Sequence, residues 1–402
     1  MSVNTKSDRK VCVVGLGYIG LPTAALLAGR GYDVHGVDVV DSVVETINQG
    51  KIHIVEPELD EFVRAAVESG KLVASKDPVA SDVYIIAVPT PFHEGFVPNV
   101  DYIDAAAKSI APFVQPGNIV ILESTSPIGA TVDLAKVLEA EGVDTSKVHI
   151  AHCPERVLPG QIMKELVEND RIVGGTTPEA TKATADFYRE FVQGEVLETD
   201  STTAEMAKLT ENSFRDVNIA FANELSMLCD KFGISAWDVI RLANHHPRVN
   251  ILNPGVGVGG HCIAVDPWFI VHAGQDDAKI IRTAREVNLA KTEWVVNRIK
   301  EVASHFQEKN GKAPKVACLG LSYKPDIDDL RESPSLEITK ELMAGGLDVV
   351  AVEPNISTLK DVNLMDLPQA LGASDIVAVL VPHKEFANLE HSNIWNFCSP
   401  SK

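Results

Sequence analysis

The sequence predicts an α/β protein in which two doubly wound parallel-sheet domains are joined by a central helical domain with one long helix. A strand–turn–helix–strand pattern opens the chain, a related pattern returns after Pro314, and a long helical run lies between them. The 402 residues are enough for several hydrophobic cores. We expect domains at residues 1–199, 200–305 and 306–402.

The opening pattern begins with a continuous apolar run at residues 11–14, which is typical of a strand buried on both faces. The glycine-rich stretch GLGYIG follows at residues 15–20, and then an Ala- and Leu-rich helix that ends at Gly29 or Gly31. A second strand at residues 34–37 ends at an aspartate. In this setting G-x-G-x-x-G is the fingerprint of a Rossmann-like dinucleotide-binding domain.

Each residue of the fingerprint has a physical role. Gly15 permits the tight turn, Gly17 lets the backbone approach a pyrophosphate, and Gly20 lets helix and strand pack closely. The helix N-terminus offers free N–H groups to the phosphates. Asp38 can accept hydrogen bonds from a ribose 2′-OH and would repel a 2′-phosphate, so the expected cofactor is NAD.

Further apolar runs continue the first sheet, because their lengths and flanking turns are typical of strands. We expect these strands at residues 83–88, 119–122, 148–151 and 171–173. Thr90 and Thr125 then follow two of them, at the carboxyl strand ends where open parallel sheets bind ligands.

The long helix is expected from Thr202 to Phe232, with Thr202 or Thr203 as its cap. Lys208, Asn212 and Arg215 share one face of it, at i, i+4 and i+7. This stripe is either a solvated face or a polar face that looks into a cleft. A helix of this length also suggests a dimer surface.

The stretch GGHCIAVDP at residues 259–267 places Cys262 after a glycine-rich loop. We expect Cys262 to start the next helix, where a nearby helix N-terminus and a lysine raise the thiolate fraction. A lone cysteine is more often structural, and four of the six cysteines do lie in apolar runs. None forms a CxxC pair, so no metal site is expected.

NAD together with a nucleophilic cysteine indicates a particular reaction. Oxidation of an alcohol to an aldehyde needs only NAD and a base. Oxidation of the aldehyde to an acid by hydride transfer needs a tetrahedral adduct, which a thiolate provides as a thiohemiacetal and then a thioester. A cysteine therefore favours a four-electron oxidation.

The pattern after Pro314 repeats the first with a changed fingerprint. VCVVGLGYIG is answered by VACLGLSYKP, so that Ser322 takes the place of Gly17 and Lys324 that of Ile19. A lysine in the phosphate turn suits another phosphorylated ligand, such as a nucleoside diphosphate; the alternative is a surface lysine in a loop.

The bulk composition excludes some classes of function. A net charge of −20 disfavours general binding of nucleic acid or of an anionic membrane. The apolar runs are too short to span a membrane, and the N-terminus has no signal core. We therefore expect a cytoplasmic protein.

Taken together, GLGYIGLPTA, AVPTPF, ESTSPIG, CPERVLPG, KLTENSFRDVNIAFANE, GGHCIAVDPWF and GLSYKPDIDDLRESPS resemble the nucleotide-sugar 6-dehydrogenase family, which includes the UDP-glucose and GDP-mannose dehydrogenases. The resemblance implies an NAD domain, a central helical domain and a UDP domain, and a homodimer joined through the central helices. HPRVNILNPGVGVGGHCIAVDPWFIV is most similar to members that oxidise UDP-N-acetyl-D-mannosamine to the uronate, a precursor of surface polysaccharides.

The resemblance also implies catalytic roles. Cys262 would be the nucleophile, and Lys208 would transfer protons and stabilise the developing oxyanion with help from Asn212. Asp266 would orient a water molecule or support the lysine. Glu155 would be the base for thioester hydrolysis, acting on a water molecule that Thr125 helps to position.

Binding roles follow in the same way. The positions that match sugar and diphosphate contacts are Arg156, Val157, Lys208, Asn212, Arg215, His246, Arg248 and Gly257, with Tyr323 and Lys324 on the UDP side. The positions that match NAD contacts are Gly15, Gly17, Tyr18, Ile19, Gly20, Asp38, Thr90, Thr125 and Arg331.

One departure from the family is the brief C-terminus HSNIWNFCSPSK, in which we expect no apolar strand to close the third domain. Alternative substrates are UDP-N-acetylglucosamine and UDP-glucose. A two-electron hydroxyacid dehydrogenase and a non-catalytic nucleotide-sugar sensor are the alternatives from other classes.

Overall fold

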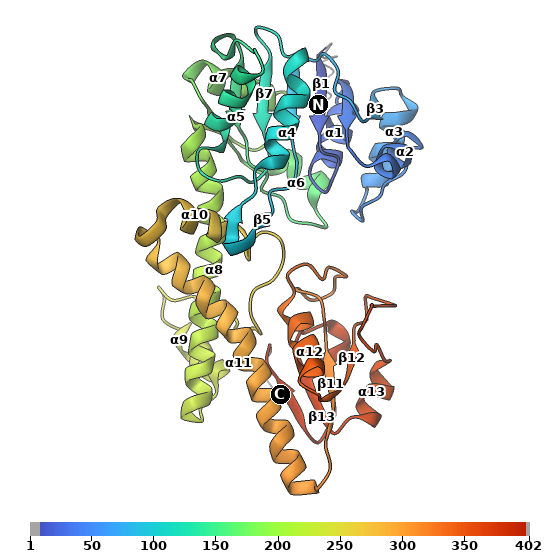
Figure 1. The fold of residues 1–402 in the computed structure, drawn as a ribbon, viewed down its shortest axis with the longest axis vertical. Helices are drawn as coiled ribbons and strands as arrows, with labels where there is room; N and C mark the ends of the chain where they lie inside the picture. The colour runs from blue at the N-terminus through green and yellow to red at the C-terminus, as the bar shows by residue number, and fades with distance from the viewer. Residues whose placement is uncertain (1–8, 399–402) are drawn as a thin grey trace. The chain divides into compact units, whose positions relative to one another are not determined.

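The computed structural model describes residues 9–398, which divide into two compact units with the boundary between Leu209 and Thr210. The boundary falls inside one helix, α8 (Ser201–Phe232). Both units contain a sheet of mainly parallel strands with helices, which confirms the predicted α/β class (Figure 1). In the described part of the chain, the helices lack the length or the apolar character that a membrane crossing requires.

The first unit is built on an eight-stranded sheet with the strand order β10-β9-β8-β7-β4-β1-β2-β3. All neighbours are parallel except β8 and β9. The strands are β1 Lys10–Val14, β2 Asp33–Val37, β3 Leu72–Ser75, β4 Val83–Ile86, β7 Ile119–Leu122, β8 His149–His152, β9 Arg171–Gly175 and β10 Val196–Asp200, with a separate hairpin of β5 Phe92–His93 and β6 Val97–Pro98. The predicted strands are all present, although the one expected at 83–88 ends two residues earlier.

Helices cover this sheet over two separate hydrophobic cores, as a doubly wound sheet requires. They are α1 Gly20–Gly29, α2 Asp41–Asn48, α3 Leu59–Glu68, α4 Asp101–Ile110, α5 Ala130–Ala140, α6 Ile162–Glu168 and α7 Pro178–Arg189. One core takes α1, α2, α3, α6 and α7, and the other takes α4 and α5. The buried strands between the cores are apolar on both faces, which explains their continuous hydrophobic runs.

The expected cap of the long helix is wrong. The helix begins one residue before Thr202, and its first turn is capped by Asp200, whose carboxylate accepts from the Thr203 N–H at 2.9 Å and from the Thr203 hydroxyl at 2.6 Å. Aspartate is a good N-cap because its oxygen satisfies an N–H that has no partner inside the helix. The end at Phe232 before Gly233 is as expected.

The second unit adds three more helices around the later part of α8, namely α9 Ala236–Ala243, α10 Asp266–Gly274 and α11 Lys279–Asn310. Its sheet has the order β12-β11-β13-β14 with every pair parallel. The elements are β11 Lys315–Leu319, α12 Pro334–Ala344, β12 Asp348–Val352, α13 Leu367–Ala373, β13 Ile376–Val379 and β14 Ile394–Asn396. The expectation of no closing strand is therefore wrong, since β14 pairs with β13.

The internal repeat extends to backbone geometry. Gly15 and Gly320 both have positive φ, +92° and +88°, and each donates its N–H at 2.8 Å to the last residue of the neighbouring strand, Val37 or Val352. The next N–H in each turn, from Leu16 or Leu321, donates to the carboxylate that follows this strand, Asp38 or Glu353. The two sheets thus use the same turn.

Candidate functional site

The glycine-rich turn of the first unit fits a bound pyrophosphate. A Cβ on Gly15 would lie 2.5 Å from the carbonyl oxygen of Ala87, and one on Gly20 would lie 1.8 Å from that of Gly15. A Cβ on Gly17 would meet no atom within 4 Å, so its backbone borders open space. The tight turn and close helix packing therefore require the two outer glycines, and the middle one leaves room for a ligand.

Asp38 lies at the carboxyl end of β2, as predicted for a group that binds the ribose. One carboxylate oxygen accepts from the Leu16 N–H at 3.0 Å and the other from the Val40 N–H at 3.0 Å. The side chain is half-buried, and each oxygen keeps a further lone pair for a hydroxyl donor. Tyr18 and Ile19 lie in the same turn, directly before α1.

Thr90 and Thr125 are brought together, as expected for residues that follow adjacent strands. The Thr90 hydroxyl donates to the backbone carbonyl of Thr125 at 2.6 Å. Beside it, the Ser124 hydroxyl donates to the Val88 carbonyl at 2.8 Å. These bonds tie the loops after β4 and β7 to each other.

Glu155, Arg156 and Val157 follow β8. One oxygen of the Glu155 carboxylate accepts from the Val157 N–H at 2.6 Å, and the other lies 3.9 Å from Nη1 of the buried Arg171. Arg156 donates to the backbone carbonyl of Asp170 at 3.1 Å. The loop thus presents a nearly buried carboxylate next to a fixed cation.

Lys208 is half-buried near the start of α8. His152, at the end of β8, has its pKa lowered to about 3, mainly by burial and in part by the positive charge of Lys208. His152 is therefore neutral at pH 7. Three residues before the lysine, the Glu205 carboxylate accepts from the Gly129 and Thr131 N–H groups, which fixes this part of α8 against the start of α5.

Asn212, Asp266 and Cys262 form a second group, within the second unit. The Asn212 amide donates to the Asp266 carboxylate at 2.5 Å, and both side chains are buried. The Cys262 carbonyl accepts from the N–H groups of Val265 at 3.0 Å and Asp266 at 2.8 Å. The prediction that Cys262 starts the next helix is wrong. Cys262 lies in the turn four residues before α10, where it is partly exposed.

The glycine-rich loop before Cys262 packs closely against Thr292 and Tyr323. A Cβ on Gly257 would lie 2.4 Å from the Thr292 hydroxyl, and one on Gly260 would lie 2.9 Å from the ring of Tyr323. The Gly260 N–H donates to the Arg331 carbonyl at 3.0 Å. The loop therefore needs glycine in order to pass close to Tyr323 and Arg331, two residues that the sequence assigned to nucleotide binding.

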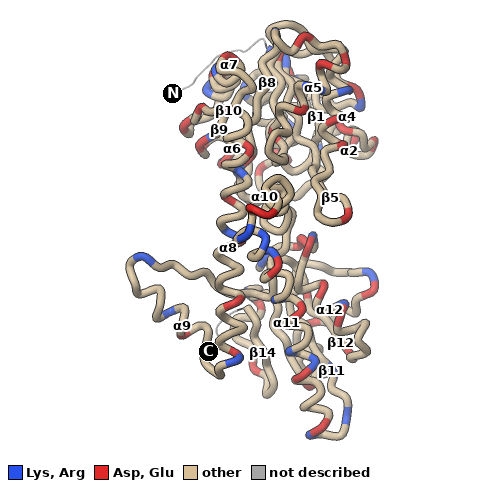
Figure 2. The backbone as a smooth tube through the Cα atoms, turned by 60° about the vertical axis from the view of Figure 1, so that its left-hand side comes forward, with Lys and Arg blue, Asp and Glu red and all other residues tan. Residues whose placement is uncertain are grey.

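The remaining predicted binding residues are on the surface. Arg215, His246, Arg248 and Lys324 are exposed, and the Arg331 guanidinium pairs with the Asp329 carboxylate at 2.6 Å. Figure 2 shows Asp and Glu scattered over the elements of both units, interspersed with Lys and Arg. An anionic ligand would therefore depend on single cations such as these.

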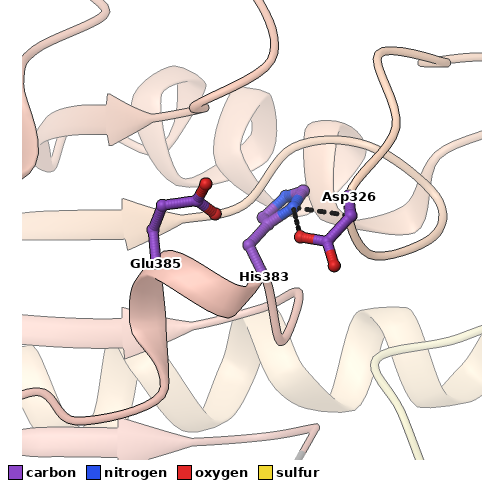
Figure 3. A group of neighbouring side chains, drawn as sticks. All are labelled: Asp326, His383 and Glu385. Carbon is purple, nitrogen blue, oxygen red and sulfur yellow. Dashed lines mark hydrogen bonds and ion pairs between the residues drawn. The ribbon is translucent and has the colours of Figure 1, made fainter.

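Among the described residues, Asp326, His383 and Glu385 bring three possible metal ligands together (Figure 3). The imidazole of His383 is already engaged, because Nδ1 accepts from the Asp326 N–H at 2.9 Å and Nε2 lies 3.1 Å from the Glu353 carboxylate. A metal ion would have to displace the first of these bonds. We therefore assign the buried His383 to holding the turn that follows β11.

Three family models match the chain: the NAD binding domain of the UDP-glucose/GDP-mannose dehydrogenase family at residues 9–192, its central domain at 202–290 and its UDP binding domain at 317–401. UDP-N-acetyl-D-mannosamine dehydrogenase of Campylobacter jejuni is 55% identical over 97% of this chain and 99% of its own. NDP-N-acetyl-D-galactosaminuronic acid dehydrogenase of Ralstonia nicotianae is 54% identical over 95% and 92%.

Among solved structures, that of UDP-D-ManNAc dehydrogenase from Pyrococcus horikoshii superimposes with a TM-score of 0.88 at 37% identity, covering 97% of this chain and 95% of the other. The likeness thus extends to all three matched domains and to the whole length of the relatives. The chain belongs to the UDP-glucose/GDP-mannose dehydrogenase family and is an NAD-dependent nucleotide-sugar dehydrogenase.

Proposed function

We propose that the protein oxidises the C6 hydroxyl of UDP-N-acetyl-D-mannosamine to a carboxylate, with two NAD and one water consumed for each sugar. The names of the relatives from Campylobacter jejuni and Pyrococcus horikoshii support this substrate. The UDP binding domain match supports the nucleotide. The product, a nucleotide-activated uronate, suits the synthesis of surface polysaccharide in the cytoplasm.

The observation that carries the four-electron reaction is the contrast between Cys262 and the other cysteines. Burial raises the pKa of Cys12 to about 11 and those of Cys153, Cys318 and Cys398 to about 12. Burial also raises the pKa of Cys229. These five thiols stay protonated at neutral pH and are poor nucleophiles. Cys262 and Cys398 are both partly exposed, but the Cys398 thiol donates to the Val379 carbonyl at 3.6 Å, whereas Cys262 lies in the glycine-rich turn before α10.

In the first half-reaction, Lys208 takes the proton of the C6 hydroxyl, and carbon C6 gives up a hydride that NAD bound at the first glycine-rich turn would accept, which leaves an aldehyde. The Cys262 thiolate then adds to the aldehyde carbon, and Lys208 and Asn212 stabilise the oxygen that becomes negative. Loss of the second hydride converts the thiohemiacetal to a thioester. Asp266 orients Asn212, a role supported by the 2.5 Å hydrogen bond between them.

In the second half-reaction, water cleaves the thioester and restores the thiol. Glu155 takes the proton of the attacking water, and Thr125 helps to hold that water. The hydrogen bond from the Val157 N–H to Glu155 supports this role, because it fixes the orientation of the carboxylate.

The nucleotide-binding residues are those that match the family's contacts, and each of the two related turns contains some of them. NAD binds at Gly15, Gly17, Tyr18, Ile19, Gly20, Asp38, Thr90, Thr125 and Arg331, and UDP binds at Tyr323 and Lys324. The sugar and diphosphate contact Arg156, Val157, Lys208, Asn212, Arg215, His246, Arg248 and Gly257. The exposed positive charges of Arg215, Arg248 and Lys324 support the diphosphate contacts.

We further propose that the protein is a homodimer joined through the central helices. Phe214, Phe221, Leu228 and Phe232 repeat at spacings of seven, seven and four on α8 and expose 68%, 59%, 43% and 68% of their surfaces. Such a stripe of large apolar side chains marks a protein–protein interface. The division into residues 1–199, 200–305 and 306–402 places this stripe in the central domain.

A second candidate substrate is an NDP-N-acetyl-D-galactosamine derivative, since the relative from Ralstonia nicotianae is almost as similar as the first. A panel of UDP-sugars, assayed with NAD, separates the candidates. We expect the highest kcat/KM with UDP-N-acetyl-D-mannosamine and two NADH for each uronate. A higher kcat/KM with the N-acetylgalactosamine, N-acetylglucosamine or glucose derivative of UDP would overturn the proposed substrate. One NADH for each sugar would overturn the proposed four-electron chemistry.

A further inference from the structure

A buried charged cluster lies behind Glu155 in the first unit. Arg171, the first residue of β9, places Nη1 3.8 Å from a Glu123 oxygen and 3.9 Å from a Glu155 oxygen. The three side chains are 2%, 0% and 9% exposed. The Glu123 and Glu155 oxygens that face Arg171 have no hydrogen-bond partner among the described side chains and backbone, so the guanidinium is the charge that both share.

The cluster is anchored on several elements. Glu123 follows β7, and its second oxygen accepts from the hydroxyl of Thr23 in α1 at 3.2 Å. Arg171 donates through Nη2 to the Leu166 carbonyl at 3.3 Å and lies 5.6 Å from the ring centre of Tyr188. Both ends of the cluster are therefore held in place by neighbouring elements.

The other titratable groups that face the cluster are uncharged at neutral pH. Burial raises the pKa of the Cys153 thiol to about 12 and that of the Tyr188 phenol well above its usual value. Burial and the charge of Glu155 raise the pKa of Glu123 to about 7 against the opposing effect of Arg171. The net charge of the cluster thus depends on whether Glu123 holds a proton.

We propose that Arg171 and Glu123 are positioning residues that set the basicity of Glu155 through the guanidinium that the two carboxylates share. When Glu123 is ionised, Arg171 divides its charge between two carboxylates, and Glu155 holds a proton more readily. When Glu123 is neutral, the charge acts on Glu155 alone and makes it a weaker base. This inference rests on the proposed role of Glu155 in thioester hydrolysis.

The experiment separates hydrolysis from oxidation. Enzyme is mixed rapidly with UDP-sugar and NAD and quenched with acid, and the mass of the intact protein reports the thioester on Cys262 as it forms and decays across pH 5 to 9. Below pH 7 Glu123 is neutral in the wild type, so Glu123→Gln should leave the acid limb of the decay rate in place. Between pH 7 and 9, where wild-type Glu123 is ionised, we expect the decay rate of Glu123→Gln to be about threefold lower because Glu155 is then a weaker base, with the NADH formed in the first turnover unchanged.

Replacing the cation should move the acid limb of the decay rate to higher pH. Arg171→Met alone leaves two buried carboxylates without a cation and is expected to fold poorly. The double variant Glu123→Gln/Arg171→Met removes this problem, and its limb should lie at higher pH than that of Glu123→Gln. The acid limb of Arg171→Lys should lie nearer to that of the wild type, because lysine keeps the positive charge. Glu179→Gln, at an exposed carboxylate at the start of α7, is the control and should match the wild type.

Two negative outcomes are distinguishable. If Glu155→Gln accumulates the thioester while Glu123→Gln and the double variant keep the wild-type pH profile, the coupling through Arg171 is wrong and the role of Glu155 stands. If Glu155→Gln hydrolyses the thioester at the wild-type rate, Glu155 is not the base, and both the assignment and the inference that depends on it are wrong.

Discussion

Removal of the Glu205 side chain tests how the site is held together. The carboxylate is 1% exposed and accepts three hydrogen bonds, from the Gly129 N–H at 2.6 Å, the Thr131 N–H at 2.8 Å and the Thr131 hydroxyl at 2.6 Å. Helix α5 starts directly after Gly129, which has no side chain for capping, so Glu205 supplies the cap from α8.

The cost of Glu205→Ala follows from these bonds. Hydrogen bonds to a charged group contribute about 1.5–3 kcal/mol each, and the burial that raises the pKa of Glu205 offsets part of the sum. We expect a loss of about 3 kcal/mol in the free energy of unfolding, or about 6–12 °C in Tm for a unit of this size. Since Thr125 precedes Gly129 on the same loop and Lys208 follows Glu205 by one turn, kcat should fall as well.

The assay is calorimetric unfolding with steady-state kinetics at the same pH. Glu68→Ala, at an exposed position at the end of α3 in the same unit, is the control and should change the free energy of unfolding by less than about 0.5 kcal/mol. Equal Tm values for Glu205→Ala and this control would refute the reasoning, since the three bonds would then contribute nothing.

Other predictions concern cofactor choice, acid stability and assembly. Asp38→Asn keeps an acceptor for the Leu16 N–H but removes the negative charge, so the ratio of kcat/KM for NAD to that for NADP should fall; an unchanged ratio contradicts the role of Asp38. Burial alone would raise the pKa of Glu353, but hydrogen bonds from His383 and from backbone N–H groups lower it to about 2. The ionised Glu353 carboxylate therefore stabilises the fold above about pH 4.5, and this stabilisation is lost as the pH falls towards 2. Glu353→Gln should flatten the acid unfolding curve recorded by tryptophan fluorescence. A curve parallel to that of the wild type would exclude Glu353 as a source of acid sensitivity. Phe221→Asp places a charge in the apolar stripe of α8 and should give monomers in analytical ultracentrifugation; dimers of wild-type stability would rule out this interface. Lys324→Ala should weaken UDP-sugar binding, and a loss confined to kcat would contradict the UDP site.

Most of the fold could be predicted because its central strands are buried on both faces and therefore read as continuous apolar runs. Within the two larger sheets, the strands that the sequence did not reveal are β3, β10 and β14, and all three are edge strands. β10 and β14 carry exposed or polar residues, such as those in VLETD and IWN, because an edge needs no apolar run. Local sequence therefore underestimates the edges of a sheet.

The site could be predicted in part. Thr90 and Thr125 lie together, as their places after two strands indicated. The hydrogen bond between Asn212 and Asp266 was not predicted, because helix spacing related Asn212 only to Lys208 and Arg215. The link from Glu123 through Arg171 to Glu155 could not be predicted, because it joins three separate strand ends and its geometry exists only in the folded sheet. The signal available was a charged residue at or near one end of each of the three strands.

The central claim is that Cys262 forms the covalent intermediate of a four-electron oxidation, and Cys262→Ala tests it most directly. The measurement is the amount of UDP-sugar uronate formed per enzyme over time with NAD in excess, resolved by anion exchange. The account predicts uronate from the wild type and none from the variant, which should still bind UDP-sugar. Uronate formation by Cys262→Ala at the wild-type rate would contradict it.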